Sequence, residues 1–136
     1  MIDITDREFS IDEIVRQTAR PSMGAIVLFL GVVREESRGQ AVEHLEFEAD
    51  RKTAISELET IRDEAIRKFG VTDVSIVHRT GSLTVGENIL VIAVGAAHRD
   101  EAFKGCRYVI DELKSRAAIW KKEFTESGSY WVGGEH

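Results

Sequence analysis

The sequence predicts an α+β fold in which helices cover a mainly antiparallel sheet. Segments whose apolar residues recur at helical spacing are interspersed with short apolar or alternating segments typical of strands. Several strand segments follow one another without a helix between them, which favours hairpins over a regular parallel sheet. The chain has 136 residues, enough for one hydrophobic core, so we expect a single domain over residues 1–136.

The first part of the chain contains two expected strands and one helix. Residues 1–9 alternate polar and apolar side chains, which predicts a short edge strand. Ser10 is placed to cap a brief helix over residues 11–19, and Pro21 ends it. Residues 24–33 form a continuous apolar run, the pattern of a strand buried on both faces. We expect this run to be the centre of the sheet.

The middle part begins with a polar, glycine-containing stretch at residues 34–40, which has the composition of a mobile loop. Residues 42–49 alternate cleanly and are expected to pair with the preceding strand as a hairpin. Apolar positions at helical spacing predict a long helix over residues 51–69. Asp50 is its expected cap and Gly70 its C-terminal stop.

The last part contains one helix among further strands. Four segments have strand-like composition, namely residues 71–80, 88–97, 118–125 and 130–132. The first two are joined by residues 81–87, in which glycines occupy turn positions. A helix lies between the second and the third, and Asp100 is its expected N-cap because a short carboxylate can accept from the first-turn amides.

The charge and cysteine content exclude several classes of protein. The 24 acidic and 18 basic side chains give a net charge of −6, which argues against a general nucleic-acid binder. We expect a cytoplasmic protein, because the sequence shows neither a signal-peptide pattern nor a membrane-length apolar run. The histidines and Cys106 lack the spacing of metal ligands, so no metal site is expected. Cys106 falls on the apolar face of its helix and is expected to be a buried structural thiol.

Basic residues are grouped around the last helix. His98 and Arg99 stand at its start, where unpaired amides and the helix dipole favour an anion such as phosphate. Lys114 falls near its C-terminus and Lys121 lies in the segment beyond it. Neighbouring cations lower the pKa of a lysine, which can then act as a proton donor, a base or a nucleophile. The alternative is that Lys114 only complements the helix dipole and that the His-Arg pair is a solvated cap.

Six short segments occur in a recognisable order: Gly31–Arg34, Leu45–Ala49, Ile76–Gly81, Gly86–Glu87, Ala97–Arg99 and Lys114–Lys121. Together they resemble the MoaE family, the catalytic (large) subunit of molybdopterin synthase. The resemblance covers nearly the whole chain, and the closing pattern Lys-x-Arg-Ala-x-x-Trp-Lys is its most specific part.

This resemblance implies an α/β-hammerhead-type fold and a homodimer within a heterotetramer. A small ubiquitin-like sulfur carrier of the MoaD type would dock on each subunit and insert its C-terminal Gly-Gly thiocarboxylate. The carrier would supply sulfur twice to cyclic pyranopterin monophosphate, and the product would be the dithiolene of molybdopterin. The resemblance implies that this step needs no metal or other cofactor.

The resemblance also assigns roles to residues of the site. Lys114 corresponds to the essential active-site lysine of the family and Lys121 to its second lysine. Arg34, His98 and Arg99 correspond to ligands of the anion and the pterin, and His98 and Arg99 are expected to reach across the dimer from the neighbouring subunit. Backbone groups at four further positions are expected to line the pocket: Val32, Val33, Lys122 and Glu123.

Two of the quoted segments have an alternative interpretation. Arg34 lies beside Glu35 and Glu36 and can pair with one of them instead of binding a ligand, a contact of little energetic weight. His78 and Arg79 fit the family pattern, but we interpret them as the structural end of a strand.

The chain departs from the family pattern at Ala118 and Val85, where proline is usual, and at Asp50, where an aromatic residue is frequent. Losing a fixed φ angle at Ala118 could loosen the placement of Lys121. Two other classes of function remain open from the sequence. One is a non-catalytic dimeric module that binds an anionic metabolite through the same cations. The other is a scaffold subunit that recruits a partner along an exposed strand edge.

Overall fold

The computed structural model describes residues 1–132, so the last four residues of the expected domain lie outside the described part. Within it the elements follow in the order β1 (Ile2–Thr5), α1 (Ile11–Thr18), β2 (Ala25–Val32), β3 (Glu36–Ser37), β4 (Gln40–Ala49), α2 (Arg51–Phe69), β5 (Asp73–Arg79), β6 (Gly81–Thr84), β7 (Asn88–Ala96), α3 (Arg99–Arg116), β8 (Ile119–Thr125) and β9 (Gly128–Val132). None of the helices in residues 1–132 is long and apolar enough to cross a membrane.

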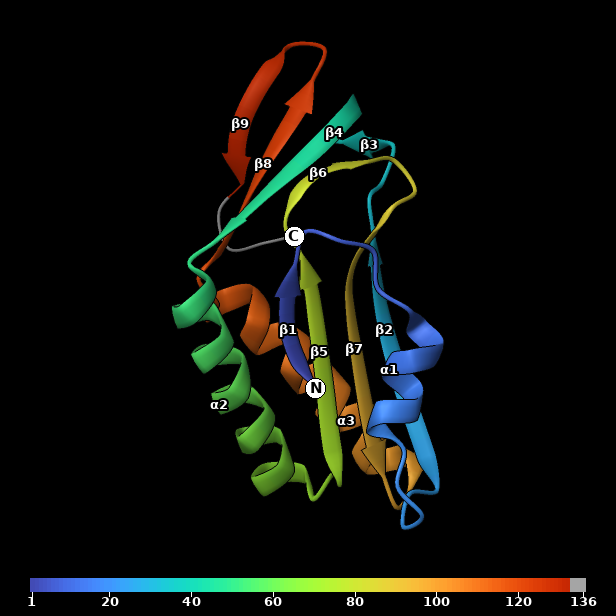
Figure 1. Cartoon of the computed structure of the whole chain (residues 1–136). Coiled ribbons are helices and arrows are strands. Elements are labelled where there is room, and N and C mark those ends of the chain that lie inside the picture. Colours follow the sequence, from blue (N-terminus) through green and yellow to red (C-terminus); the bar gives the residue numbers. More distant parts are fainter. Residues whose placement is uncertain (133–136) are drawn as a thin grey trace.

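The strands form two sheets rather than the one expected (Figure 1). The first sheet has the order β1-β5-β7-β2, and only its β1–β5 pair is parallel. The second has the order β3-β4-β8-β9, with β6 pairing to β4, and all of its pairs are antiparallel. The expected α+β class with a mainly antiparallel arrangement is therefore confirmed.

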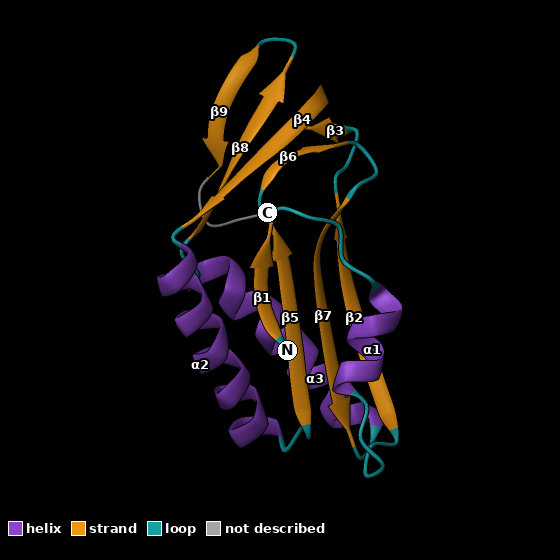
Figure 2. Cartoon of the chain, in the orientation of Figure 1, coloured by secondary structure: helices purple, strands orange, loops and turns teal. Residues whose placement is uncertain are grey.

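Strand β7 is one of the two internal strands of the first sheet, and both of its faces are covered. Val91 and Ala93 pack on the side of α1, together with Ile14 of that helix. Leu90, Ile92, Val94 and Ala96 pack on the opposite side, with residues of α2 and α3. In Figure 2, α3 passes behind the strands and α2 lies beside them, while α1 lies at the other side of the sheet.

The prediction that residues 24–33 form the centre of the sheet is wrong. They form β2, which pairs only with β7 and lies at the edge of the sheet. Three of its side chains are partly open on one face: Leu28 is 39%, Leu30 37% and Val32 42% exposed. An apolar run shows that a strand is apolar on both faces, but it does not show whether both faces are covered within one chain.

The expected hairpin between β2 and β4 is also absent. Strand β4 pairs with β3, β6 and β8. Strand β2 pairs with β7 from Ala25 to Val32, which is the full length of β2. Strand β4 therefore belongs to the second sheet, and the chain crosses between the sheets in residues 33–35, between β2 and β3. Alternation of side chains predicted a strand here correctly, but it carries no information about its neighbour.

The helix ends follow local signals where those signals are strong. The side chain of Ser10 accepts from the Glu13 amide at 3.2 Å, as predicted for the cap of α1. Helix α2 has its predicted bounds, and Gly70 ends it with φ 70° and ψ 22°, the left-handed conformation in which glycine is favoured. Asp50 occupies the N-cap position, but its carboxylate accepts from the Thr53 hydroxyl instead of a backbone amide.

The N-cap of α3 is His98, not the predicted Asp100, and the helix begins at Arg99. Asp100 lies in the first turn, where its carboxylate is 3.0 Å from the Lys104 ammonium group. The extended backbone of His98, with φ −130° and ψ 152°, marks the boundary, although its side chain makes no capping bond.

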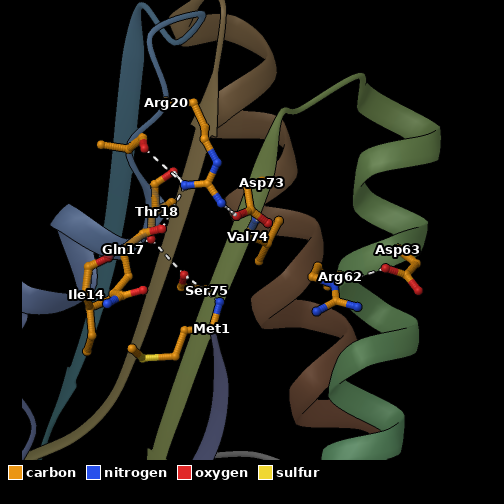
Figure 3. Close-up of polar contacts among 11 residues, drawn as sticks. Met1, Ile14, Gln17, Thr18, Arg20, Arg62, Asp63, Asp73, Val74 and Ser75 are labelled. Carbon is orange, nitrogen blue, oxygen red and sulfur yellow. Dashed lines mark hydrogen bonds and ion pairs between the residues drawn. The ribbon is translucent and has the colours of Figure 1, made fainter.

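Polar contacts attach α1 to the first sheet (Figure 3). The Thr18 hydroxyl donates to the Ile14 carbonyl at 2.7 Å and lies 2.7 Å from the Ser75 hydroxyl of β5. The amino nitrogen of Met1 donates to the same Ser75 oxygen at 3.1 Å. Thr18 and Ser75 are fully buried, so each hydroxyl depends on these partners for its hydrogen bonds. Outside them, Arg20 pairs with Asp73 at 3.0 Å.

We expect Thr18→Val to lower the free energy of unfolding by about 1–2 kcal/mol, because it removes a buried hydrogen-bonding partner of Ser75 without changing the side-chain shape. The matched control is Thr60→Val, which removes an exposed hydroxyl that also donates to the carbonyl four residues earlier. The control should change stability by no more than about 0.5 kcal/mol. Urea unfolding of both variants measures the difference, and equal losses would contradict this account.

Candidate active site

A pocket of about 210 Å³ lies where the end of β2 meets the second sheet. Three cationic side chains line it: Arg34, Lys114 and Lys121. Its walls are largely apolar and come from both sheets, including Phe29, Leu30, Val42, Leu45, Phe47, Ile89 and Leu90. Two carboxylates, those of Glu36 and Glu123, also line it. Because the cations outnumber the carboxylates among the lining residues, the pocket suits an anionic ligand.

Distant parts of the chain deliver these three cations. Arg34 follows the end of β2, and Lys114 stands in the last turn of α3, which ends at Arg116. Lys121 lies on β8, where Ile119, Lys121, Glu123 and Thr125 alternate inward and are buried. Figure 1 shows α3 running from the lower end of the first sheet toward the junction of the two sheets. Lys114 in its last turn lines the pocket.

Lys121 and Glu123 form a buried ion pair at the pocket. The Lys121 Nζ lies 3.5 Å from a Glu123 carboxylate oxygen, and the two side chains are only 9% and 6% exposed. Burial lowers the pKa of Lys121, and the charges of Arg34 and Lys114 lower it further, while Glu123 opposes the shift. The Lys121 ammonium group therefore gives up its proton more readily than an exposed lysine does.

The Glu123 carboxylate is held in its charged form by several neighbours. Burial alone would raise its pKa, but hydrogen bonds from Ser37 and Tyr130 and the charge of Lys121 outweigh that effect. The pKa of Glu123 is therefore lowered, and the carboxylate stays ionised beside Lys121 at neutral pH. The Ser37 hydroxyl donates to it at 2.8 Å.

Residues 34–40 contain part of a hairpin rather than only the loop that their composition predicted. They contain β3, which pairs with the start of β4 through a two-residue turn at Arg38 and Gly39, both with positive φ. The guanidinium carbon of Arg38 lies 4.9 Å from the centre of the Tyr130 ring. Ser37 and Arg38 thus connect this hairpin to β8 and β9, and Arg34, which lines the pocket, lies just before it.

His98 and Arg99 lie at the opposite end of α3 from the pocket. Lys114 stands fifteen positions after Arg99, which corresponds to about 22 Å along the helix axis. The His98 side chain is 81% exposed, and its nearest carboxylate, that of Glu101, is 3.6 Å away. One chain therefore brings Arg34, Lys114 and Lys121 together but leaves His98 and Arg99 outside.

The other predicted positions differ in how they relate to the pocket. Val32 lines it, whereas Val33 does not, and both backbone groups of Val33 are bonded to the turn before β7. Lys122 points to the outer face of β8, with its ammonium group 5.3 Å from the Phe124 ring centre and 5.4 Å from that of Trp131. Glu123 lines the pocket, and its carboxylate pairs with the Lys121 ammonium group.

Sequence reasoning missed the carboxylate of Glu123, the Ser37 hydroxyl and His78, all of which line the pocket. Alternation along β8 contained a usable signal, because it places Glu123 on the same face as Lys121 and Lys122 on the other. For Ser37 no local signal exists, since its role depends on pairing between β3 and β4. Arg34 makes no ion pair among residues 1–132, so the alternative pairing with Glu35 or Glu36 is not observed.

Ala118, which stands where the family usually has proline, is fixed in another way. Its backbone amide donates to a Glu57 carboxylate oxygen of α2 at 2.8 Å, a bond that a proline nitrogen cannot make. Its carbonyl oxygen accepts from the Asp50 amide at 3.2 Å. The segment that leads from α3 to Lys121 is therefore held to α2 by hydrogen bonds in place of a restrained φ angle.

Cys106 is buried, as predicted, and has no disulfide partner. Burial raises the pKa of its thiol to about 11, so the reactive thiolate form is disfavoured at neutral pH.

His78 is also buried, and its Nδ1 lies 2.7 Å from the Arg79 carbonyl oxygen, which can only accept. Its ring meets that of Phe47 edge-on at 5.0 Å between centres.

The fold and the site together define a mixed α+β protein with a cationic pocket between two sheets. The family model described as MoaE protein matches residues 4–116. The molybdopterin synthase catalytic subunit of Pyrococcus abyssi is 44% identical over 128 residues, which cover 94% of this chain and 86% of that protein. The chain belongs to the MoaE family, and the resemblance seen in its sequence is confirmed.

Solved structures agree with the family and the fold. The molybdopterin synthase structure from Staphylococcus aureus has a TM-score of 0.91 and 38% identity, and covers 96% of this chain and 95% of that one. A chain from the complex of subunits 1 and 2 of molybdopterin-converting factor from Helicobacter pylori has a TM-score of 0.78, with 96% of this chain and 89% of that one covered. At 19% identity the second likeness concerns the fold alone. The expected hammerhead-type fold is thereby confirmed.

We expect the buried His78 to destabilise the protein below pH 6.5. Desolvation lowers its pKa from 6.5 to about 4 in the folded chain. Above pH 6.5 the ring is neutral in both states and has no effect. Between pH 6.5 and 4 the unfolded chain binds a proton that the folded chain does not, so stability falls by up to about 1.4 kcal/mol per pH unit.

The measurement is chemical unfolding of wild type and His78→Gln at several pH values between 7.5 and 4.5. The titrations of Glu123 and other carboxylates act in both proteins, so the difference between them isolates His78. The stability advantage of wild type should shrink as the pH falls. Parallel stability curves would show that the folded protein binds the proton as readily as the unfolded one.

Proposed function

We propose that the pocket lined by Arg34, Lys114 and Lys121 is the site of sulfur transfer. The chain is a catalytic subunit of molybdopterin synthase. It takes sulfur from the C-terminal thiocarboxylate of a small ubiquitin-like carrier subunit and delivers it to cyclic pyranopterin monophosphate, forming the dithiolene of molybdopterin. The observation that carries the assignment of the site is the convergence of three cations from distant segments, one of them buried beside Glu123.

The substrate phosphate is the natural partner of Arg34, whose planar guanidinium group matches two phosphate oxygens at once. The pocket volume of about 210 Å³ is below the range of roughly 300–1,000 Å³ usual for small-molecule sites. We infer that one chain forms only part of the site. Residues of a second copy and the tail of the carrier would form the remainder.

Lys114 and Lys121 would handle charge and protons during the transfer. In net terms each transfer replaces one oxygen of the hydrated substrate side chain with sulfur and leaves the carrier as a carboxylate, so neither an oxidant nor a reductant is required. Negative charge develops as the thiocarboxylate attacks and the cyclic phosphate opens. The ammonium groups stabilise that charge, and the lowered pKa of Lys121 suits it to pass a proton.

A two-fold arrangement at the free edge of β2 would bring His98 and Arg99 to the site. The Gly24 amide donates to the Ala96 carbonyl. His98, two residues after Ala96, therefore lies near the start of β2, whereas Arg34 lies just beyond the end of that strand. Antiparallel pairing of two β2 edges sets the start of one strand against the end of the other. The eight residues of β2 span about 26 Å, similar to the length of α3 between Arg99 and Lys114.

In this arrangement the exposed side chains of Leu28, Leu30 and Val32 become buried between the subunits. The partner subunit's His98 and the partner subunit's Arg99 then join Arg34 around the substrate anion. The functional unit is a homodimer of this chain with one carrier on each copy, a heterotetramer. We also propose that the reaction takes place in the cytoplasm, where an unpaired thiol such as that of Cys106 stays reduced.

We expect Lys114→Ala to lower single-turnover formation of the dithiolene product by at least about a thousand-fold while leaving the fold and carrier binding intact. Purified chain, thiocarboxylated carrier and cyclic pyranopterin monophosphate make up the assay. The matched control is Lys104→Ala on the same helix, whose ammonium group is exposed and pairs with Asp100. Unchanged turnover in Lys114→Ala would remove that lysine from the reaction. Substrate binding without turnover by wild type would instead favour the non-catalytic binding module.

We expect two inactive variants to restore activity when mixed as dimers. In a heterodimer of Arg99→Ala and Lys114→Ala, one of the two sites combines an intact Lys114 with the partner's intact Arg99. Random reassociation after mild denaturation should therefore recover about a quarter of the wild-type rate. If Arg99 served the site of its own chain, every site in the mixture would lack one residue and no activity would return.

A further inference from the structure

Arg79 is a buried cation at the end of β5 that the proposed site does not use. Its side chain is 9% exposed, and its Nη1 lies 3.4 Å from a Glu87 carboxylate oxygen. The same nitrogen donates to the Asn88 carbonyl at 3.3 Å. Burying an arginine costs much desolvation free energy unless the guanidinium group is paired. The role of Arg79 is therefore to be sought in its ion pair with Glu87.

Glu87 closes the turn between β6 and β7. Its second carboxylate oxygen accepts from the Thr84 amide at 2.7 Å and from the Thr84 hydroxyl at 3.1 Å. The Glu87 amide in turn donates to the Thr84 carbonyl at 3.0 Å. Gly86 within this turn has φ 88°, a conformation that favours glycine. Arg79 and Thr84 thus fix Glu87 from two sides, and the turn has one defined shape.

This turn holds the residue that precedes Arg34. The Gly86 amide donates to the Val33 carbonyl at 3.0 Å, and the Val33 amide donates to the Glu87 carbonyl at 3.0 Å. The ladder between β2 and β7 shifts register between Gly31 and Val32 and resumes with the pair Val32–Asn88, so the two Val33 bonds lie just beyond an irregularity in the ladder. The Val33 side chain is 3% exposed. Both backbone groups of Val33 are therefore fixed by the turn, and its side chain is held by burial.

We propose that Arg79 and Glu87 are positioning residues for the reaction: by holding residues 84–87 against Val33, they set the direction in which Arg34 enters the pocket. This inference rests on the proposed function of Arg34. Neither side chain lines the pocket, so both act through the backbone of Val33. The alternative is that the ion pair contributes to stability alone.

The first test is Glu87→Gln, which keeps the side-chain shape and its acceptor for Thr84 but removes the charge that faces Arg79. The matched control is Asp73→Asn, which neutralises another arginine-paired carboxylate at the opposite end of β5. We expect Glu87→Gln to raise the KM for cyclic pyranopterin monophosphate about ten-fold, since small displacements of a binding group have effects of this size. The control should leave KM unchanged. Equal effects of both variants, or none from Glu87→Gln, would overturn the proposal.

The second test combines Glu87→Gln with Arg34→Ala. If Glu87 acts through Arg34, it has nothing left to position in the Arg34→Ala background, and the double variant should have the same kcat/KM as Arg34→Ala within about two-fold. A general loosening of the structure would reduce kcat/KM by a similar factor in either background. Multiplicative losses would therefore assign the ion pair to stability and overturn the positioning role.

A third measurement separates this inference from the proposed function. Amide hydrogen exchange at Val33 and Gly86 reports the two backbone bonds directly and does not depend on activity. We expect exchange at both amides to be at least about ten-fold faster in Glu87→Gln than in wild type or Asp73→Asn. Unchanged exchange would overturn the positioning role even if the enzyme is impaired. Full activity of Arg34→Ala with accelerated exchange would instead reject the role of Arg34 in the site.

Discussion

The burial of β7 on both faces is the constraint on which the rest of the structure depends. Its alternating apolar side chains require a cover on each side of the first sheet, which α1 provides on one face and α2 with α3 on the other. Because α3 has to run along the sheet to provide that cover, its two ends lie far apart. Lys114 arrives at the pocket, while His98 and Arg99 are carried to the opposite end. The division of the proposed site between two subunits follows from this packing.

The second sheet adds a low-dielectric wall to the pocket. Strand β8 buries Lys121 and Glu123 side by side. The attraction between the two charges offsets part of the free energy that each loses when it is removed from water. Ser37 contributes a further hydrogen bond from β3. Water is excluded from one side of the cationic cluster, so charges that develop there interact more strongly than they would at the surface. The pocket thus combines an apolar lining with a small number of fixed charges.

Local signals in the sequence predicted where helices and strands occur better than they predicted which strands lie next to one another. Helix α2 has its predicted bounds because Gly70 is a strong stop signal that needs no tertiary information. The run that became β2 was placed wrongly, since apolarity does not reveal which strand lies alongside or whether a face is left for a second subunit. Lys114 and Lys121 were singled out because basic residues are grouped around the last helix, whereas Arg34 was found through the family pattern. Alternation along β8 could have placed the Glu123 carboxylate beside Lys121. The hydroxyl of Ser37, in contrast, depends on the pairing of β3 with β4, which no single segment encodes.

The hydrogen bond between Glu57 and the Ala118 amide has an evolutionary consequence. A proline restrains the chain by itself, whereas an amide at this position needs an acceptor on the neighbouring helix. Loss of the proline becomes tolerable once an acceptor stands at position 57, and loss of the acceptor becomes tolerable once proline returns. The two positions should therefore covary among relatives, with a carboxylate or amide side chain at 57 wherever 118 is not proline.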